Sequence, residues 1–246
     1  MTLEEVRVQI DQVDKEIKEL FCKRMALADN VATVKAETAD AIFKPDREEI
    51  IIEKQSADVE ESIRKEYIAF IKRVMEVSRK YQYGRTLELR DCFDINYATE
   101  QEAIKKADSS EGILENADGK WSDETLQRLC TEKKYINRCK AVAEDGQVHK
   151  VAEISDSLVV LPEHNRIMIT FSCQDKLNGL AKLLTMITDY DVDITQMHTV
   201  VKKADTKKYQ FYFELKANLL EKEIKALLFQ LENESKEFQV IGSYSL

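Results

Sequence analysis

Apolar residues recur at alternating spacings of three and four through the first part of the sequence. The seam consists of Leu3, Val6, Ile10, Val13, Ile17, Leu20, Leu27, Val31 and Val34. This heptad pattern continues for about five repeats without an internal Gly or Pro, which predicts one very long helix. A helix of about 36 residues would measure some 54 Å.

Two further helices are predicted before residue 90. Pro45 is the only helix breaker between residue 1 and about residue 83, and it predicts the start of a short helix near residues 46–55. A second seam with helical spacing runs through Ile63, Tyr67, Phe70, Val74, Val77 and Tyr81. Residues 1–90 are therefore predicted to form a unit of three helices, long, short and long.

The pattern changes near residue 166. Strand-like alternation over 167–171, at 192–194, over 209–215 and at 238–241 encloses two helical stretches over 180–187 and 220–231. The order is βαββαβ, which predicts a ferredoxin-like antiparallel sheet with two helices on one face. Residues 165–246 are assigned to this α+β domain.

Residues 91–164 form the segment between these two regions, and their pattern is the least regular. Helical patches are expected near 100–107 and 123–140, within a short mixed α/β segment that holds Gly112, Gly119 and Gly146. The chain is therefore predicted to be a multi-domain α and α+β protein. Trp121, Cys130 and Cys139 are expected to be packing residues.

Composition narrows the classes of function. The 246 residues carry a net charge of −9, which argues against a nucleic-acid binder. No apolar run approaches the roughly 18 residues of a membrane span. The acidic start enters a helical pattern at once, so no signal peptide is expected and the cytoplasm is the predicted compartment. The five cysteines are scattered and read as reduced thiols. An anionic ligand would therefore need a local basic cluster.

Such a cluster is suggested by Arg24, which occupies a seam position where an apolar residue is expected. It could bind an anion, extend to the bundle edge or pair with a core glutamate. Lys35 follows eleven residues later, about 16 Å along nearly the same face. Arg47 and Glu48 stand at the start of the short helix, where an exposed surface pair is the alternative.

A polar stripe marks the third predicted helix. Ile71, Met75, Ser78 and Gln82 follow one helical face. Two neutral polar groups on a buried face would need partners. The alternative is that the stripe is the solvated flank of the Val74 and Val77 seam.

Arg7 lies 28 residues before Lys35, about 42 Å along one helix, so both could reach one small ligand only across two chains. The long helix also exceeds what one three-helix unit can cover. We therefore predict an intertwined homodimer in which each site uses Arg7 of the partner subunit.

The residues at these positions resemble the all-helical (AroQ-class) chorismate mutases, as found at the head of chorismate mutase–prephenate dehydratase proteins. The matching runs are Val6–Asp11, Lys23–Met25, Val34–Lys35, Pro45–Glu49 and Met75–Gln82. The resemblance implies that Arg24 and the partner's Arg7 hold substrate carboxylates and that Lys35 and Gln82 contact the ether oxygen. It implies that Arg47, Glu48 and Ser78 position the rest. Lys44 departs from the family, which usually has an acidic residue there.

The C-terminal domain resembles the ACT regulatory domain of the same bifunctional proteins, which dimerises and binds an aromatic amino acid such as phenylalanine. The resemblance places effector-binding residues at Leu177, Asn178, Gly179, Leu180, Ala181, His198 and Thr199. Leu177 and Asn178 replace the usual Pro-Gly, and His198 could equally be an ordinary strand residue.

The middle segment faintly resembles a shortened dehydratase region. Asp156-Ser157-Leu158 falls where the dehydratase has its catalytic Thr-Arg-Phe, so prephenate dehydratase activity is not expected. The predicted function is conversion of chorismate to prephenate in aromatic amino acid biosynthesis, without cofactor or metal and with phenylalanine or tyrosine as the possible effector. The alternatives are a non-catalytic ACT-domain regulator with a pseudoenzyme helical domain, a helical scaffold without a ligand, and a bifunctional mutase–dehydratase.

Overall fold

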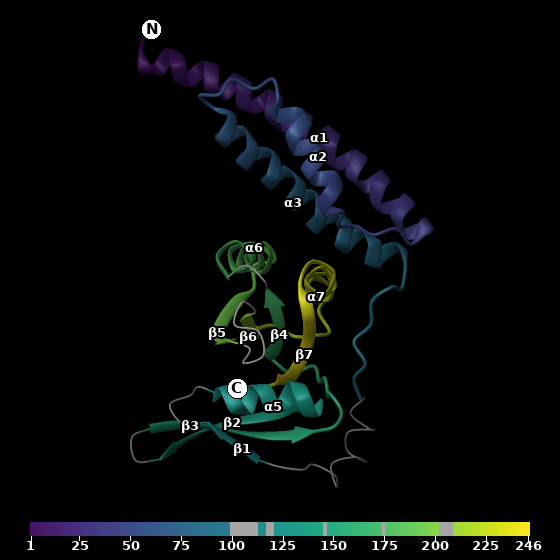
Figure 1. Ribbon diagram of the computed structural model, residues 1–246, viewed down its shortest axis with the longest axis vertical. Helices are drawn as coiled ribbons and strands as arrows, with labels where there is room; N and C mark the ends of the chain where they lie inside the picture. The colour runs from purple at the N-terminus through teal and green to yellow at the C-terminus, as the bar shows by residue number, and fades with distance from the viewer. Residues whose placement is uncertain (99–112, 117–120, 145–146, 174–175, 202–208) are drawn as a thin grey trace. The chain divides into compact units, whose positions relative to one another are not determined.

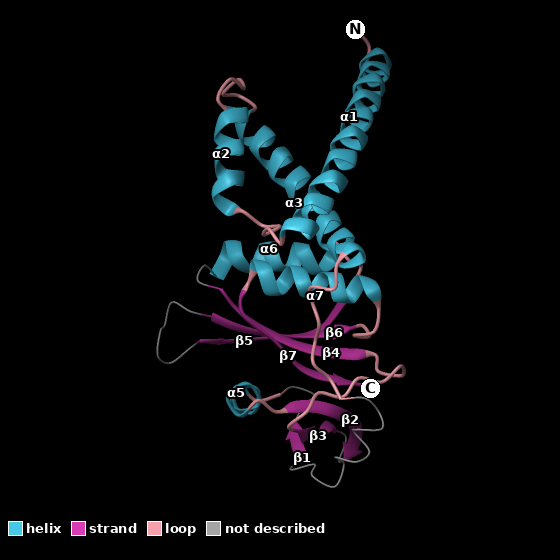
Figure 2. Ribbon diagram, turned by 90° about the vertical axis from the view of Figure 1, so that its right-hand side faces the viewer, coloured by secondary structure: helices cyan, strands magenta, loops and turns pink. Residues whose placement is uncertain are grey.

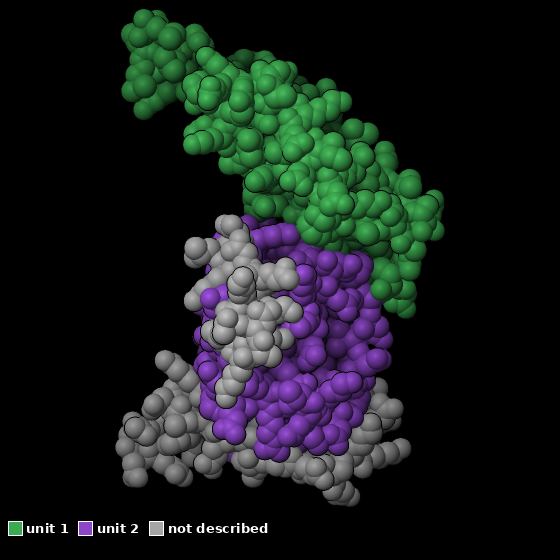
Figure 3. Space-filling view, in the orientation of Figure 1, with its two compact units in different colours: residues 1–92 green, residues 93–246 purple. Residues whose placement is uncertain are grey.

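The computed structural model describes residues 1–98, 113–116, 121–144, 147–173, 176–201 and 209–246 (Figure 1). The chain divides into two compact units, residues 1–92 and 93–246, which Figure 3 shows in different colours. No helix among the described residues has the length and apolarity needed to cross a bilayer. The boundary expected near residue 165 stays a prediction.

The first unit consists of the three predicted helices, α1 (Leu3–Thr38), α2 (Pro45–Ser56) and α3 (Arg64–Leu89). Thr2 and Glu5 form a capping box at the start of α1, and Ala39 ends the helix in the left-handed conformation. Pro45 occupies the first turn of α2, where a missing N–H group is tolerated. The long, short, long arrangement predicted from the sequence is confirmed.

Within one chain, α1 does not pack against α3 through its apolar seam. The buried residues of α1 are Ala28, Ala32 and Ala36, whereas every residue from 1 to 23 is exposed except half-buried Val6. Large apolar side chains of the seam are open to solvent, with Leu20 and Leu27 each 64% exposed. Small residues at intervals of four allow close helix packing but bury little apolar area.

The buried face of α3 is the polar stripe. Ile71, Met75, Ser78 and Gln82 are all buried, while Phe70 and Tyr81 of the predicted seam are exposed. The interpretation of this stripe as a solvated flank is therefore wrong. The apolar seam and the polar stripe lie side by side on α3. The larger apolar residues of the seam wrongly indicated that it was the buried face.

The C-terminal part of the second unit has the predicted βαββαβ order. Its elements are β4 (Arg166–Cys173), α6 (Lys176–Thr188), β5 (Asp193–Val201), β6 (Tyr209–Lys216), α7 (Lys222–Glu234) and β7 (Lys236–Tyr244). The strands lie in the order β7-β4-β6-β5 with antiparallel neighbours, so the ferredoxin-like arrangement is confirmed. Both helices lie on one face of the sheet (Figure 2), over a core that includes Phe171, Phe211 and Phe213.

The preceding segment extends the same sheet. It contains β1 (Ile113–Asn116), α5 (Asp123–Glu132), β2 (Tyr135–Glu144) and β3 (Gln147–Ser155). The full strand order is β1-β3-β2-β7-β4-β6-β5, with β2 joined to β7 through the parallel pair Ile136 and Gly242. Trp121 and Leu126 of the α5 region pack with Tyr212 and Tyr244 in a second core.

One expectation for this segment is wrong. The helical patch expected over 123–140 ends at Glu132, and Lys133 in the left-handed conformation turns the chain into β2. Pairing of β2 with β3 is non-local and overrides the local helical signal. The patch expected near 100–107 lies outside the described residues.

Candidate active site

The side chain of Arg24 reaches from α1 to α3. Its Nη1 donates hydrogen bonds to Ser78 Oγ at 2.7 Å and to the Val74 carbonyl at 3.3 Å. Burial lowers the pKa of Arg24, and the negative charge of Glu48 opposes this effect. A half-buried guanidinium is thus fixed against the polar stripe rather than extended into solvent.

Lys35 lies near the C-terminal end of α1, and it is also half-buried. Its Nζ donates to the carbonyl of Ile42 at 2.8 Å. Burial lowers the pKa of Lys35, the positive charges of Lys44 and Arg47 lower it further, and Asp40 and Glu48 oppose them. The ammonium group is therefore surrounded by charges of both signs near the start of α2.

Ser78 and Gln82 lie one turn apart on the buried face of α3. Gln82 Nε2 donates to the Ser78 carbonyl at 3.3 Å, whereas the buried Gln82 Oε1 has no hydrogen-bond partner in the described structure. The hydroxyl of Thr86, a further turn along, is buried and without a hydrogen-bond partner there as well. Buried polar atoms without partners are uncommon, and they can mark the position of a bound ligand.

Glu48 of α2 is held by Arg79 of α3. Arg79 Nη1 lies 2.5 and 2.6 Å from the two carboxylate oxygens, and the guanidinium stacks over the Phe43 ring at 4.9 Å from its centre. The Arg79 side chain is only 6% exposed. Sequence reasoning missed Arg79, although a basic residue directly after Ser78 on a helix with a buried polar face was a usable signal.

Two of the predicted site residues are exposed within one chain, although the charge of Arg47 still acts on Lys35. Arg47 is exposed on α2, and Arg7 is exposed on α1, where it pairs with Glu4 at 3.4 Å. Arg7 precedes Arg24 by 17 residues, about 25 Å along the helix. Lys44, the departure from the family pattern, is exposed to a similar degree as its partner Asp40, with which it forms an ion pair.

An apolar groove adjoins Arg24. It encloses about 550 Å³ between α1 and α3 and is lined mainly by Ile17, Leu20, Phe21, Phe70, Ile71 and Val74. Asp14, Lys18 and Arg24 add charge to its wall. The groove lies along the exposed seam of α1, so it offers a continuous apolar surface next to the polar site.

The predicted effector residues are divided between the two faces of the sheet. The backbone of Leu177, Asn178, Gly179, Leu180 and Ala181 forms the first turns of α6, and the side chains of Leu177 and Asn178 lie outside the described residues. His198 pairs with Tyr212 and thus faces the α5 side of the sheet. Thr199 pairs with Phe211 on the α6 side.

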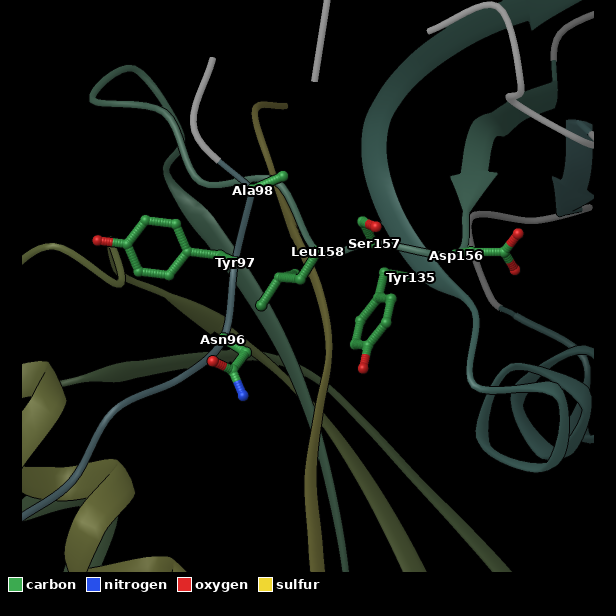
Figure 4. Close-up of a pocket in the computed structure, with 7 residues that line it drawn as sticks. All are labelled: Asn96, Tyr97, Ala98, Tyr135, Asp156, Ser157 and Leu158. Carbon is green, nitrogen blue, oxygen red and sulfur yellow. The ribbon is translucent and has the colours of Figure 1, made fainter. Parts of the chain in front are cut away.

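A second pocket, of about 300 Å³, lies in the second unit where β2 begins. Asn96, Tyr97, Ala98, Tyr135, Asp156, Ser157 and Leu158 line it (Figure 4). Asp156 forms an ion pair with Lys134 at 2.6 Å. Tyr97 and Asp156 point away from each other, so their polar groups do not converge on one point. The pocket therefore does not gather its polar groups as the α1–α3 contact does.

The comparison with protein families identifies the helical unit. The protein-family model described as chorismate mutase type II matches residues 6–83. These residues form a chorismate mutase type II domain. Within it, Arg24, Lys35, Ser78 and Gln82 lie on the two helices that the α1–α3 contact brings together. No curated protein sequence is similar enough to this chain to count as a match.

Several solved structures are similar to parts of the chain. One is titled as GqqA, a novel type of quorum quenching acylase, with 15% identity, a TM-score of 0.47 and coverage of 59% of this chain and 77% of that one. Another is a prephenate dehydratase from Streptococcus mutans, with 17% identity, a TM-score of 0.44 and coverage of 61% and 84%. At these TM-scores the likenesses establish no activity for this chain.

Proposed function

We propose that this protein is a chorismate mutase that rearranges chorismate to prephenate at the polar stripe of α3. The observation that carries the proposal is the pairing of half-buried Arg24 with Ser78 beside the unpartnered Gln82 Oε1. This set lies inside the stretch that matches the chorismate mutase type II family. In a protein with a net charge of −9, two half-buried cations, Arg24 and Lys35, lie in this unit.

The chemistry suits this set of residues. The rearrangement is intramolecular, so the protein has to select a compact conformer of a dianion and stabilise the negative charge that develops on the ether oxygen. In this proposal Arg24 binds a carboxylate, while Lys35 and Gln82 donate hydrogen bonds to the ether oxygen. Glu48 and Arg47 orient the rest of the substrate. Gln82 would turn its amide so that Nε2 faces the substrate.

The proposal is tested by the loss of chorismate absorbance with purified protein. Wild-type protein should turn chorismate over, and Arg24→Ala should lower kcat/KM by roughly a thousandfold because a buried charge contact to substrate is lost. Arg73→Ala, which changes an exposed arginine of α3, is the matched control and should retain activity. Absence of turnover in the wild type would favour the pseudoenzyme regulator instead.

We further propose that the active form is a homodimer in which α1 of each chain covers the other. The exposed seam of residues 3–20 and the adjoining groove support a second copy of α1 as the occupant. A dimer would also bring the partner's Arg7 to a site that its own helix cannot reach. The exposed apolar side chains are far more than a surface helix of a monomer usually shows.

Mixing two inactive variants tests the shared site. Arg7→Ala and Arg24→Ala should each be inactive, but a heterodimer contains one site with an intact Arg24 and an intact partner Arg7. Unfolding and refolding an equal mixture should therefore recover about a quarter of wild-type activity. No recovery, with dimers formed, would contradict an active site shared between subunits.

A regulatory role is proposed for the ferredoxin-like domain. Its β7-β4-β6-β5 order is the arrangement expected for an ACT domain that binds an aromatic amino acid. Phenylalanine or tyrosine should change mutase activity, and titration of each with purified protein measures the effect. Prephenate incubated with the protein should stay prephenate, and formation of phenylpyruvate would favour the bifunctional alternative.

A further inference from the structure

The ion pair between Arg79 and Glu48 is more buried and more closely bonded than a surface pair. Both carboxylate oxygens of Glu48 contact the same Arg79 nitrogen, at 2.5 and 2.6 Å. The side chains are 6% and 23% exposed, respectively. Phe43 supports the guanidinium from one side at 4.9 Å. Arg79 therefore has little freedom to move, and Glu48 is fixed with it.

Contacts on both sides place Glu48 near the two cations of the proposed site. Its partner Arg79 follows Ser78, which Arg24 binds, and stacks on Phe43, which follows the Ile42 carbonyl that Lys35 binds. Its negative charge raises the pKa of Arg24 and of Lys35, against the larger opposite effect of burial on each. A glutamate side chain in this position could form an ion pair with either cation if nothing else held it. Such a pair would neutralise the charge that a dianionic substrate needs.

We propose that Arg79 is a positioning residue that holds Glu48 away from Arg24 and Lys35, so that both cations remain available to the dianion. This inference rests on the proposed mutase function. Arg79 cancels the charge of Glu48 without blocking its free lone pairs, so the carboxylate can still accept a hydrogen bond from a substrate hydroxyl. Nothing in the role requires Arg79 to touch the substrate.

The first experiment is a double-mutant cycle with chorismate as substrate. Arg79→Met should raise KM about tenfold or more, equivalent to about 1.4 kcal/mol, with a much smaller change in kcat. In a Glu48→Gln background the same change should alter KM by less than about threefold, because the charge that Arg79 controls is gone. Arg73→Met, at an exposed position on the same helix, is the control and should leave KM unchanged.

Two results would overturn the proposal. An equal rise in KM in both backgrounds would mean that Arg79 acts independently of Glu48, and an unchanged KM in Arg79→Met would mean that it has no such role. If Arg79→Met does not fold, Arg79→Lys keeps the charge but loses the paired geometry. It should raise KM less than tenfold, and this rise should again vanish in the Glu48→Gln background.

A crystal structure of Arg79→Met, or of Arg79→Lys, separates this inference from the mutase activity itself. We expect the Glu48 carboxylate to turn until it lies within roughly 4 Å of Arg24 Nη1 or Lys35 Nζ. A carboxylate that keeps its present position would refute the positioning role. Wild-type protein that fails to turn chorismate over would contradict the proposed function alone, since the position of Glu48 is measured without substrate.

Discussion

The two units of the chain differ in how far they cover their large apolar side chains. In residues 1–92 the large apolar side chains of α1 are exposed, while Ser78, Arg79, Gln82 and Thr86 of α3 are buried. In the described part of residues 93–246, the only exposed large apolar side chains are Met197, Leu220 and Leu246. The described part of the second unit covers most of its large apolar side chains within one chain, whereas the first unit does not.

The exposed seam and the unpartnered polar atoms of the first unit bear on its proposed function. Polar groups are costly to bury without partners, and on α3 this cost applies to Gln82 Oε1 and the Thr86 hydroxyl, because Ser78 and Arg79 are paired with Arg24 and Glu48. The exposed apolar seam of α1 favours coverage by a second surface, because removing apolar area from water lowers the free energy. The helical unit therefore leaves an apolar surface uncovered within one chain, whereas the described part of the sheet unit leaves few large apolar side chains exposed.

Removal of the Lys35 side chain should have a large effect on catalysis. Lys35→Ala should lower kcat by about a hundredfold to a thousandfold, because one fixed donor aimed at developing charge is lost. Steady-state kinetics measure the effect, with the exposed Lys72→Ala as the matched control. The lowered pKa of Lys35 also predicts that kcat/KM falls at alkaline pH below the ordinary lysine value near 10.5. Full activity in Lys35→Ala would show that Lys35 takes no part in the reaction.

A charge in the exposed seam should break the assembly of the helical unit. Ile17 is 44% exposed in one chain and lines the apolar groove. Ile17→Asp would bury a carboxylate in the proposed dimer and should raise its dissociation constant about a hundredfold, close to 3 kcal/mol. Sedimentation at several protein concentrations measures this constant, with Gln12→Asp as the control outside the seam. A variant that dimerises like the wild type would exclude the seam as the interface.

Two glycine substitutions should affect the two units in opposite directions. A Cβ at Gly242 would lie 3.0 Å from Ile136 Cβ and 3.1 Å from the Ile136 carbonyl oxygen, so Gly242→Ala should destabilise the sheet. We expect a loss of about 1 to 3 kcal/mol. Gly84 of α3 has nothing within 4 Å of such an atom, and Gly84→Ala should stabilise the helix by about 0.5 to 1 kcal/mol. Chemical denaturation measures both changes, and equal signs would contradict the prediction.

The smallest effect concerns His164. Its Nδ1 lies 2.9 Å from Ser243 Oγ, and burial lowers the pKa of its imidazole. Below the ordinary histidine pKa near 6.5, the unfolded chain takes up a proton that the folded chain does not, so the free energy of unfolding decreases as the pH falls. Thermal melts of the wild type and His164→Gln between pH 7.5 and 5 should differ in slope. Parallel curves would show that His164 has no part in the acid sensitivity.

The sequence predicted the elements whose periodicity is strong and local. The 36 residues of α1 and the βαββαβ order are examples, because each depends on repeated spacing rather than on distant partners. The packing face of α1 was not predictable, since Ala28, Ala32 and Ala36 carry little hydrophobic signal. The β2 strand was also missed, because its partner β3 and its junction with β7 are set by non-local pairing.

The candidate site also combines residues that the sequence indicated with a contact that it did not. Arg24 and Ser78 were noted separately for their unusual positions on helical faces, and the structure brings them to 2.7 Å. The contact between Glu48 and Arg79 spans 31 positions and two helices, so no spacing rule could reveal it. Charged pairs between elements depend on how those elements pack, which periodicity does not encode.

The central position of β7 has a consequence for biosynthesis. This strand lies between β2 and β4, so residues 236–244 join the two halves of the sheet. The ribosome delivers them after the other described strands, and the sheet therefore stays divided until residues 236–244 have been made. During that interval the edges of β2 and β4 are open to pairing with other chains. The helices of residues 1–92 precede every described strand in the sequence and can form before the sheet is complete.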